Sequence, residues 1–522
     1  MMTSIDKNVS FYALVAAFGG FVFGLDLMNI SGAIRFISSI FSLDDGQIGR
    51  VVGIGFLGVV LALFFVGTLC ERFGRKKILL GIAFAYSLSS ILSAFAVNYE
   101  MLVVGRFIGG AAFASITVSA MYIGEIAPAN QRGKFVSVNQ LMIALGILLA
   151  SVVNYFFIKN LNSITWLTDQ NIWRYMLGAE LIANVIWIAL IFKIPESPRW
   201  LIKKGRIEEA RSILQTITPT EEIEGMISDV QDSFHNETKT DTLSQLKNLF
   251  TKRMSLILWI AIAYAIVQGG TGMNAILSFA PMIFEQIGMT TEDSFMQTVI
   301  MGIVNLAAVF IAIFTVEKLG RRFLTLAGLA LVVVAHTSTW MGFKDSTYVF
   351  NPAAMVNIEQ QLEGATVDLT KLGALEGKTF ANDVELKAKL AEIFTKKELP
   401  LASGAIINQS IVGIKPMLIL FGLFAMLAAF NMSIGPILWV VFSEIFPNNV
   451  RSVALPFAAL VQTLSSWSIS ELFPWSLSNF GAANVFLMYG VIGLIGLIVM
   501  FFIMPETKGK TIEQIEKDLV RT

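Results

Sequence analysis

Long apolar stretches without a single charge restrict most strongly how this chain can fold. Runs such as Val51–Leu69, Ile78–Val97 and Phe486–Met504 are each long enough to cross a hydrocarbon layer of about 30 Å as an α-helix. Apolar residues make up 55% of the 522 residues and charged residues only 15%, against about a quarter in soluble domains. Backbone inside lipid must satisfy its own hydrogen bonds, which favours helices over isolated strands. The sequence therefore predicts an all-α integral membrane protein.

Three short signatures occur twice in the chain, in the same order. The middle signature reads Glu-Ile-x-Pro-x-Asn-x-Arg in both copies. Self-similarity of this kind indicates a tandem duplication, so we predict twelve transmembrane helices in two six-helix pseudo-repeats. The first copies are Gly67–Lys77, Glu125–Arg132 and Pro195–Arg199, and the second copies are Val316–Arg322, Glu444–Arg451 and Pro505–Gly509.

The spacing between the first two signatures is much wider in the second copy, which places a polar insert at about residues 344–409. We expect an N-terminal half (1–195), a cytoplasmic helical linker (196–252), a C-terminal half (253–505) that carries the insert as an outer loop, and a cytoplasmic tail (506–522). The insert contains a helix-like segment near 383–397, and the sequence assigns it no role. The expected spans are 11–33, 48–69, 78–97, 101–122, 134–158, 173–194, 254–287, 296–316, 323–343, 410–443, 452–478 and 483–504.

The linker and the tail have the pattern of short amphipathic helices. Ile207, Ala210, Ile213 and Leu214 recur at helical spacing with charges opposite. Such helices either keep two halves apart or pack beneath the bundle and latch its inner face, and both interpretations stay open. In the tail, Thr511 is a candidate N-cap.

Charge placement predicts the topology. Lys and Arg cluster in alternate loops, in the linker and near the tail, and all of these segments lie on one side if both termini are cytoplasmic, as the positive-inside rule requires. The short polar N-terminus lacks the features of a removable signal peptide. We therefore expect a multi-pass protein of the cell inner (plasma) membrane.

Asp26 is the most informative single residue, since a carboxylate inside a span costs about 2.5–3.5 kcal/mol even on lenient scales. Counting about fifteen residues from the inner face puts it about 22 Å up, in the outer third. Arg106 enters the fourth span from outside and lies about 7 Å down, so the two depths agree. The arginine would favour the charged carboxylate and burial the protonated one, so the pair can bind and release a proton. The alternative is a static ion pair that only fixes packing.

The repeated signatures place acids and arginines in short cytoplasmic turns. Glycine permits such turns, and arginine can bond helix C-termini and carboxylates. These clusters would hold the inner helix ends together in one conformation and release them in another; alternatively, the basic residues only mark the inner side. The candidate cytoplasmic gate residues are Glu71, Arg72, Arg75, Glu125, Arg132, Glu317, Arg321, Glu444 and Arg451.

Amide side chains inside spans form a third group. An amide both donates and accepts hydrogen bonds, which suits a hydroxyl-rich neutral ligand, although interhelical bonding explains any one of them alone. Trp439 follows Gly435-Pro436, and Gly269-Gly270-Thr-Gly272 interrupts another span; such broken helices can line a cavity. His336 is expected to be a packing residue. The amides are Gln140, Gln268, Asn274, Asn305 and Gln462.

Several classes of function are not indicated. The sequence has no phosphate-binding loop, no metal-ligand spacing, no nucleophile arrangement and nothing that argues for nucleic acid, and its one cysteine, Cys70, excludes an intramolecular disulfide. We expect no enzyme activity, no cofactor and no metal.

Together, Gly67–Arg75, Gly105–Gly110, Pro195–Trp200, Glu317–Arg322 and Pro505–Gly509 resemble the sugar porter family of the major facilitator superfamily, and within it bacterial proton-coupled xylose and related sugar symporters. The resemblance covers nearly the whole chain. It implies two halves that rock about a central site, a bilayer environment and a monomer whose partners are a monosaccharide and a proton. It also implies that Asp26 and Arg106 couple the proton, and that Gln140, Gln268, Asn274, Trp439 and Gln462 contact the sugar with Phe23 and Asn305 nearby.

The chain departs from the family pattern at the expected sugar site. Gly269 stands where a second glutamine is usual, Leu25 where a tyrosine is usual, and Thr463 where an aromatic residue is usual; Asn431 replaces a glutamate common in facilitators. Preference for a pentose or a hexose is therefore not inherited by analogy. The sequence predicts a proton-coupled monosaccharide symporter, with a facilitative uniporter in which Asp26–Arg106 is only structural as the alternative. A non-transporting receptor would usually carry a longer cytoplasmic tail, and a drug exporter a more aromatic cavity.

Overall fold

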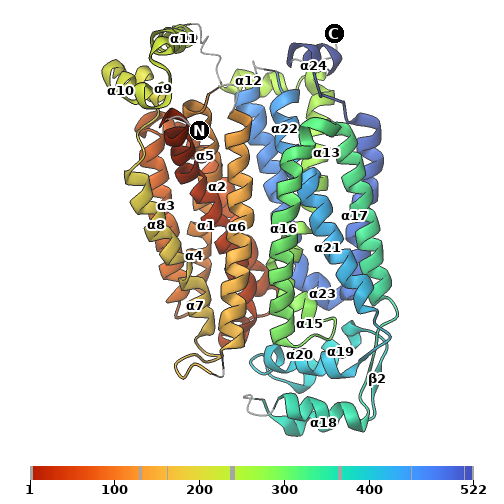
Figure 1. Cartoon of the computed structure of the whole chain (residues 1–522). Coiled ribbons are helices and arrows are strands. Elements are labelled where there is room, and N and C mark those ends of the chain that lie inside the picture. The colour runs from red at the N-terminus through yellow and green to blue at the C-terminus, as the bar shows by residue number, and fades with distance from the viewer. Residues whose placement is uncertain are drawn as a thin grey trace.

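The computed structural model describes residues 4–128, 132–161, 163–235, 242–362, 367–447, 450–510 and 512–519. Two helical bundles stand side by side, one from each part of the chain (Figure 1). The first bundle comprises α1 (Ser4–Phe41), α2 (Asp45–Phe73), α3 (Arg75–Ala94), α4 (Tyr99–Ala112), α5 (Ser115–Ile126), α6 (Arg132–Lys159), α7 (Ile172–Gly178) and α8 (Glu180–Phe192). The second comprises α13 (Ser255–Gly270), α14 (Met273–Ser278), α15 (Ala280–Glu285), α16 (Thr291–Leu319), α17 (Arg321–Phe343), α21 (Pro416–Met432), α22 (Ile434–Ile445) and α23 (Arg451–Ile503).

The described residues contain 11 helical segments that are long and apolar enough to cross a membrane. The last, Val453–Ile503, has 51 residues and would measure about 76 Å as one helix, more than twice the hydrocarbon thickness. Gly481 interrupts it with φ 80° and ψ 160°, so it supplies two spans. The predicted all-α fold with twelve spans is confirmed.

The first helix extends beyond its predicted range of 11–33. Ile34 and Ile37 follow directly and are fully buried, and Arg35 is held by partners at that end. The helix therefore continues to Phe41, because these contacts stabilise its last turns.

Helix boundaries follow from local side-chain chemistry. Asp44 and Gln47 form a capping box at the start of α2. The duplicated signature turns the chain at Gly74 (φ 95°) between α2 and α3, and at Gly320 (φ 88°) between α16 and α17. Only glycine adopts such backbone angles without strain. Each turn thereby presents the start of the next helix, Arg75 or Arg321, toward its own half.

The linker helices and the tail lie at the same end of the bundle as both chain ends (Figure 1); we call this the linker end. Asn8 of α1 donates to the carbonyl oxygen of Thr216 at 3.0 Å, so the linker is attached to the first bundle. The elements are α9 (Pro198–Lys203), α10 (Ile207–Ile217), η1 (Thr220–Glu222), α11 (Ile223–His235), α12 (Thr242–Leu249), η2 (Lys252–Met254) and α24 (Ile512–Leu519). Thr511, the candidate N-cap of the tail, lies outside the described residues.

The insert is a small folded unit at the opposite end, the insert end (Figure 1). Its buried residues, among them Tyr348, Phe350, Leu386 and Leu390, form a hydrophobic cluster separate from the main core. The three short strands pair in the order β2-β1-β3, antiparallel. Its elements are β1 (Thr347–Val349), α18 (Pro352–Gln361), η3 (Leu369–Ala374), β2 (Thr379–Phe380), α19 (Asp383–Ile393), α20 (Leu399–Ser410) and β3 (Ile411–Val412).

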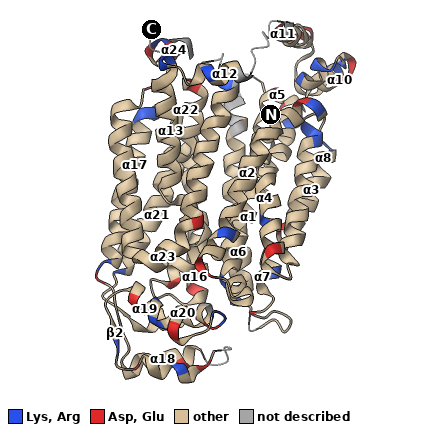
Figure 2. Ribbon diagram, turned by 180° about the vertical axis from the view of Figure 1, so that it is seen from behind, with Lys and Arg blue, Asp and Glu red and all other residues tan. Residues whose placement is uncertain are grey.

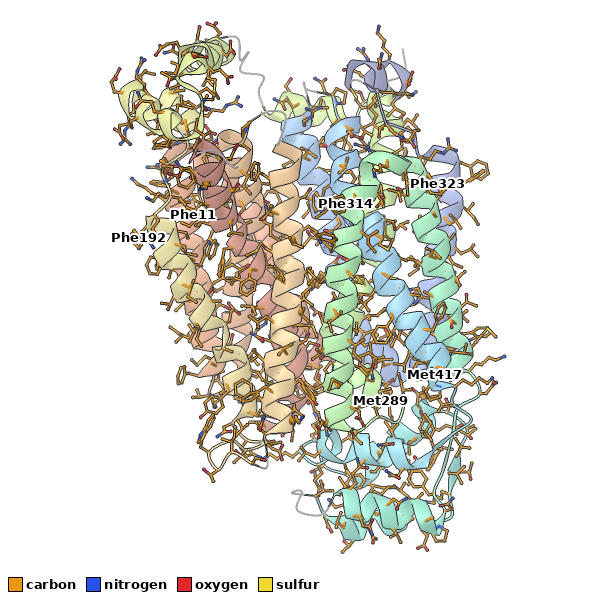
Figure 3. The ribbon with its side chains drawn as sticks, viewed as in Figure 1. Phe11, Phe192, Met289, Phe314, Phe323 and Met417 are labelled. Carbon is orange, nitrogen blue, oxygen red and sulfur yellow. The ribbon has the colours of Figure 1, made fainter. Side chains whose placement is uncertain are left out.

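The outer surface has the character expected of a lipid-facing one. Charged residues gather at the two ends, and the middle of the bundle carries few of them (Figure 2). Phe192 and Phe323 point outward from the helices (Figure 3) and are 62% and 58% exposed. Large apolar side chains at such exposure are stable in lipid rather than in water.

Close helix packing provides a test of the fold. A Cβ atom at Gly110 of α4 would lie 1.9 Å from the carbonyl oxygen of Gly55 in α2, so Gly110→Val should force these helices apart at a cost of about 1–3 kcal/mol or more. We expect the unfolding temperature of the purified protein to fall by several degrees. Gly81→Ala, where a Cβ atom meets nothing within 4 Å, is the control and should leave it unchanged. Equal unfolding temperatures for both variants would contradict this packing.

Candidate functional site

Asp26 of α1 and Arg106 of α4 form an ion pair inside the first bundle. They are 4% and 3% exposed. Small residues allow this approach: a Cβ atom at Gly109 would lie 2.5 Å from the Ser89 hydroxyl oxygen and 3.9 Å from Asp26 Oδ1. The second carboxylate oxygen, Asp26 Oδ2, has no hydrogen-bond partner among the described residues. The pair therefore combines a buried charge with an acceptor atom that is open to a proton.

A second buried carboxylate, Glu180, lies near this pair and was not among the predicted site residues. Glu180 begins α8, is 3% exposed, and accepts a hydrogen bond from Asn184 Nδ2 at 3.2 Å. It lies close enough to Asp26 and Arg106 for their charges to interact. The signal was present in the sequence, because Glu180 falls inside the predicted span 173–194 as Asp26 falls inside 11–33.

Arg75 is the centre of the cluster at the linker end of the first bundle. Its Nη2 atom donates to Glu71 Oε1 at 2.9 Å and to Glu125 Oε1 at 2.8 Å. Ser197 donates to the other oxygen of Glu125, and the backbone N–H of Arg75 donates to Glu196 at 2.8 Å. The cluster ties α2, α3 and α5 to the start of the linker.

Arg321 is the centre of the matching cluster in the second bundle. It donates to Glu444 Oε1 at 2.9 Å, and Thr507 donates to the other oxygen of Glu444. The backbone N–H groups of Arg321 and Arg322 donate to Glu506 at 3.1 and 3.2 Å. The third signature, Pro-Glu-Ser/Thr, thus supplies partners in both copies, which the sequence analysis did not assign to the clusters.

Of the remaining predicted gate residues, the structure describes the side chains of Arg72 and Arg451. Arg72 is exposed and its guanidinium lies 5.2 Å from the centre of the Phe73 ring, because it points away from the turn that aims Arg75 inward. Arg451 donates through Nε and Nη2 to the carbonyl oxygen of Phe446 at 3.1 and 2.9 Å, closing the end of α22. The side chains of Arg132 and Glu317 lie outside the described ones.

Two of the predicted amides of the second bundle, Gln268 and Gln462, meet beside a helix interruption. Gln462 Nε2 donates to Gln268 Oε1 at 2.8 Å and to Ser466 Oγ at 3.0 Å. The span with Gln268 breaks at Thr271, before Gly272 (φ 82°), as predicted. His336 Nε2 lies 2.9 Å from the Thr271 carbonyl oxygen, so this histidine, buried as predicted, satisfies the carbonyl that the break leaves open.

The other predicted sugar contacts lie on α1, α6, α14, α16 and α22. Trp439 lies in α22, just after a break at Ser433, and is 49% exposed although half of the residues of its helix are buried. Asn274 and Gln140 are partly exposed, and Asn305 is 2% exposed. Gln140 lies on α6. This helix packs against α16, the helix that carries Asn305, and also against α1. Phe23 of α1 packs edge-to-face on Phe113 with ring centres 4.5 Å apart.

Comparison with known proteins agrees with this geometry. A family described as "Sugar (and other) transporter" matches residues 12–356 and 401–519. The arabinose-proton symporter of Bacillus subtilis (strain 168) is 29% identical over 96% of this chain and 93% of its own. The D-xylose-proton symporter of Escherichia coli (strain K12) is 29% identical over 99% and 97%.

Solved structures of a sugar transporter are also similar to this chain. The structure described as the inward open conformation of the xylose transporter XylE from E. coli has a TM-score of 0.72 with 26% identity, over 97% of this chain and 99% of that one. XylE bound to 6-bromo-6-deoxy-D-glucose, described there as a major facilitator superfamily proton:xylose symporter, has a TM-score of 0.70 with 27% identity, over 98% and 99%. Residues 357–400, which the family match omits, belong to the insert.

The acid of the second cluster gives a pH prediction. Burial alone would raise the pKa of Glu506, but hydrogen bonds from the backbone N–H groups of Lys508, Arg321 and Arg322 lower it below its ordinary 4.5. Its stabilising contribution is therefore complete above about pH 4.5 and is lost as the pH falls through the lowered pKa.

Unfolding temperatures of the wild type and Glu506→Gln test this. We expect a constant difference from pH 7 to about 5 that narrows at lower pH. Glu359→Gln, at an exposed position of α18, should differ little from wild type throughout. A Glu506→Gln difference that widens on acidification would contradict the assignment.

Proposed function

This chain belongs to the sugar transporter family of the major facilitator superfamily, and we propose that it carries a pentose or hexose monosaccharide across the membrane together with a proton, by alternating access. The observation that carries the coupling is the buried ion pair of Asp26 and Arg106 beside Glu180. A charge inside a span is costly and is retained where it serves transport.

Protonation of Asp26 would change the force between α1 and α4. While Asp26 is charged, its attraction to Arg106 holds these helices together in a medium of low dielectric constant. A proton on Oδ2 removes that attraction and leaves the arginine charge within electrostatic range of Glu180. The first bundle thus has two arrangements that differ in bound proton, which is the kind of bistable element a coupled carrier requires.

The sugar would bind where the interrupted helices meet, with hydroxyl groups bonded to amides and one face against an aromatic ring. The Gln268–Gln462 bond orients both amides, and a sugar hydroxyl group would bond to the Gln268 side chain. Trp439 supplies an exposed indole face. We assign the sugar contacts to Phe23, Gln140, Gln268, Asn274, Asn305, Trp439 and Gln462.

Each of the two linker-end clusters would hold the helix ends of its own half in a fixed arrangement. Arg75 with Glu71 and Glu125, and Arg321 with Glu444, join helix ends within one bundle. We propose that each cluster keeps its half rigid as the halves rock and that the cytoplasmic gate opens between them, so that the halves 1–195 and 253–505 move as bodies. Arg132, Glu317, Arg72 and Arg451 would complete the gate.

The remaining assignments rest on charge placement and on the family. We place the linker end in the cytoplasm, because basic residues concentrate there, and the chain in the cell inner (plasma) membrane with both termini cytoplasmic. The protein would act as a monomer, with a sugar and a proton as partners, and would need neither a cofactor nor enzymatic chemistry.

Asp26→Asn separates a symporter from a uniporter. The amide keeps the size of the carboxyl but takes up no proton, so reconstituted protein should lose sugar accumulation driven by a pH gradient while sugar exchange across equilibrated membranes continues. Uptake in proteoliposomes with and without an imposed gradient measures both. If accumulation driven by the pH gradient survives in Asp26→Asn, the proton is coupled through a group other than Asp26. If the wild type ignores the gradient, the protein is a uniporter with a structural ion pair.

Gln268→Leu tests the sugar site. Loss of one neutral hydrogen bond costs about 0.5–1.5 kcal/mol, so we expect the sugar concentration for half-maximal exchange to rise by about two- to twelvefold. Asn479→Ala, at an exposed position whose amide bonds only the Trp475 carbonyl, is the control. An unchanged concentration for Gln268→Leu would remove this residue from the site.

A further inference from the structure

Two charged residues join the halves at the insert end. Arg35, on the extension of α1, bonds Glu285 at the end of α15 and the Thr291 hydroxyl at the start of α16. The side chains of Arg35 and Glu285 are only 15% and 12% exposed. Asp169, in the loop before α7, also lies within electrostatic range of Arg35. The contact therefore connects the first half to the second through a largely buried charge.

The insert covers this pair. A Cβ atom at Gly404 of α20 would lie 3.5 Å from Glu285 Oε2 and 3.7 Å from Arg35 Nη2. The Ser39 hydroxyl of α1 donates to the carbonyl oxygen of Lys397, just before α20, at 3.0 Å. The insert thus lies directly on the two charged groups and also bonds the first half. Shielding from water strengthens their attraction, because it lowers the local dielectric constant.

The other side of the insert is fixed to the second half. Asp383 Oδ2 accepts a hydrogen bond from the backbone N–H of Ala482 at 3.0 Å, next to Gly481, where the helix α23 is interrupted. Lys387 donates to the carbonyl oxygen of Leu477 at 3.4 Å. The insert also begins just after α17 and ends just before α21. It therefore stays with the second half when the halves separate, and its contacts with α1 are the ones that must break.

The two ends of the molecule are held differently. The named ion pairs at the linker end, of Arg75 and Arg321, each lie within one half. At the insert end, Arg35–Glu285 and Arg50–Glu471 both cross between halves, and Ser31 of α1 donates to the Leu277 carbonyl of α14 at 2.8 Å. The structure is thus closed at the insert end.

From these contacts we propose that Arg35 and Glu285 are positioning residues that hold the insert end closed, and that α20 of the insert is their cover. This rests on the proposed alternating access, in which the insert end must open once per cycle. The insert then has a role that the shared family fold does not supply: it biases the carrier toward the conformation closed at that end.

Cysteine labelling of the purified full-length protein tests the proposal without requiring transport. In a Cys70→Ser background, Ser31→Cys places a thiol at a position that is 1% exposed between the halves. Arg35→Gln should raise the labelling rate by a soluble maleimide about tenfold or more, because the halves separate more often. The charge-exchanged double variant Arg35→Glu with Glu285→Arg should return it toward the starting rate, which misfolding would not allow. Lys415→Ala removes an exposed pair with Asp345 at the same end and should have no effect.

The role of the cover is tested with matched glycine variants. Gly404→Trp would wedge α20 away from Arg35 and Glu285 and should also speed labelling several-fold. Gly373→Trp, elsewhere in the insert where a Cβ atom meets nothing within 4 Å, should not.

Unchanged labelling in Arg35→Gln would overturn the positioning role, and equal rates in the two tryptophan variants would overturn the cover. Faster labelling in Arg35→Gln together with no sugar transport by the wild type would support the role of Arg35 and Glu285 but refute the proposed function. Failure of the positioning role and failure of the proposed function are therefore distinguishable.

Discussion

The structure depends on keeping one ion pair, Asp26 and Arg106, inside an apolar bundle. Both side chains are almost fully buried, so removing either one would leave an uncompensated charge. The surrounding sequence adapts to this constraint, with glycines and serines on α3 and α4 that let the helices approach and a second acid, Glu180, within range. Such an arrangement adds little to stability compared with apolar packing, which supports a functional reason for retaining it.

Around this pair, the duplicated halves repeat one construction at the linker end. Arg75, Glu125, Ser197 and Glu196 in one half correspond to Arg321, Glu444, Thr507 and Glu506 in the other, with the same donors and acceptors. The insert end has no such internal symmetry, because Arg35–Glu285 and Arg50–Glu471 cross between halves there and the insert occurs once. The insert, which is present in only one of the two repeated halves, would thus favour the conformation that is closed at the insert end.

Sequence patterns predicted the membrane helices, the duplication and the depth at which Asp26 and Arg106 meet, because each follows from one-dimensional period and helix rise. The break near Gly272 followed from local glycine content. The third signature, Pro195–Arg199 and Pro505–Gly509, was recognised in the sequence. Its hydrogen bonds to Glu125 and Glu444 are tertiary contacts, which sequence spacing does not reveal. Glu180 was missed although it obeys the rule that identified Asp26, and Arg72 points away from the Arg75 cluster because adjacent residues on a helix point in different directions. The hydrogen bond between Ser39 of α1 and Lys397 of the insert joins segments more than 350 residues apart, beyond any local pattern.

The most direct test of proton coupling is the movement of protons when sugar is the only driving force. Proteoliposomes containing the wild-type protein and a trapped pH indicator, with no initial pH gradient, are given a saturating inward gradient of a transported sugar. Coupling through Asp26 predicts that the lumen acidifies as the sugar enters, in fixed proportion to it, and that Asp26→Asn abolishes the acidification. Sugar entry with no change in internal pH would contradict the account.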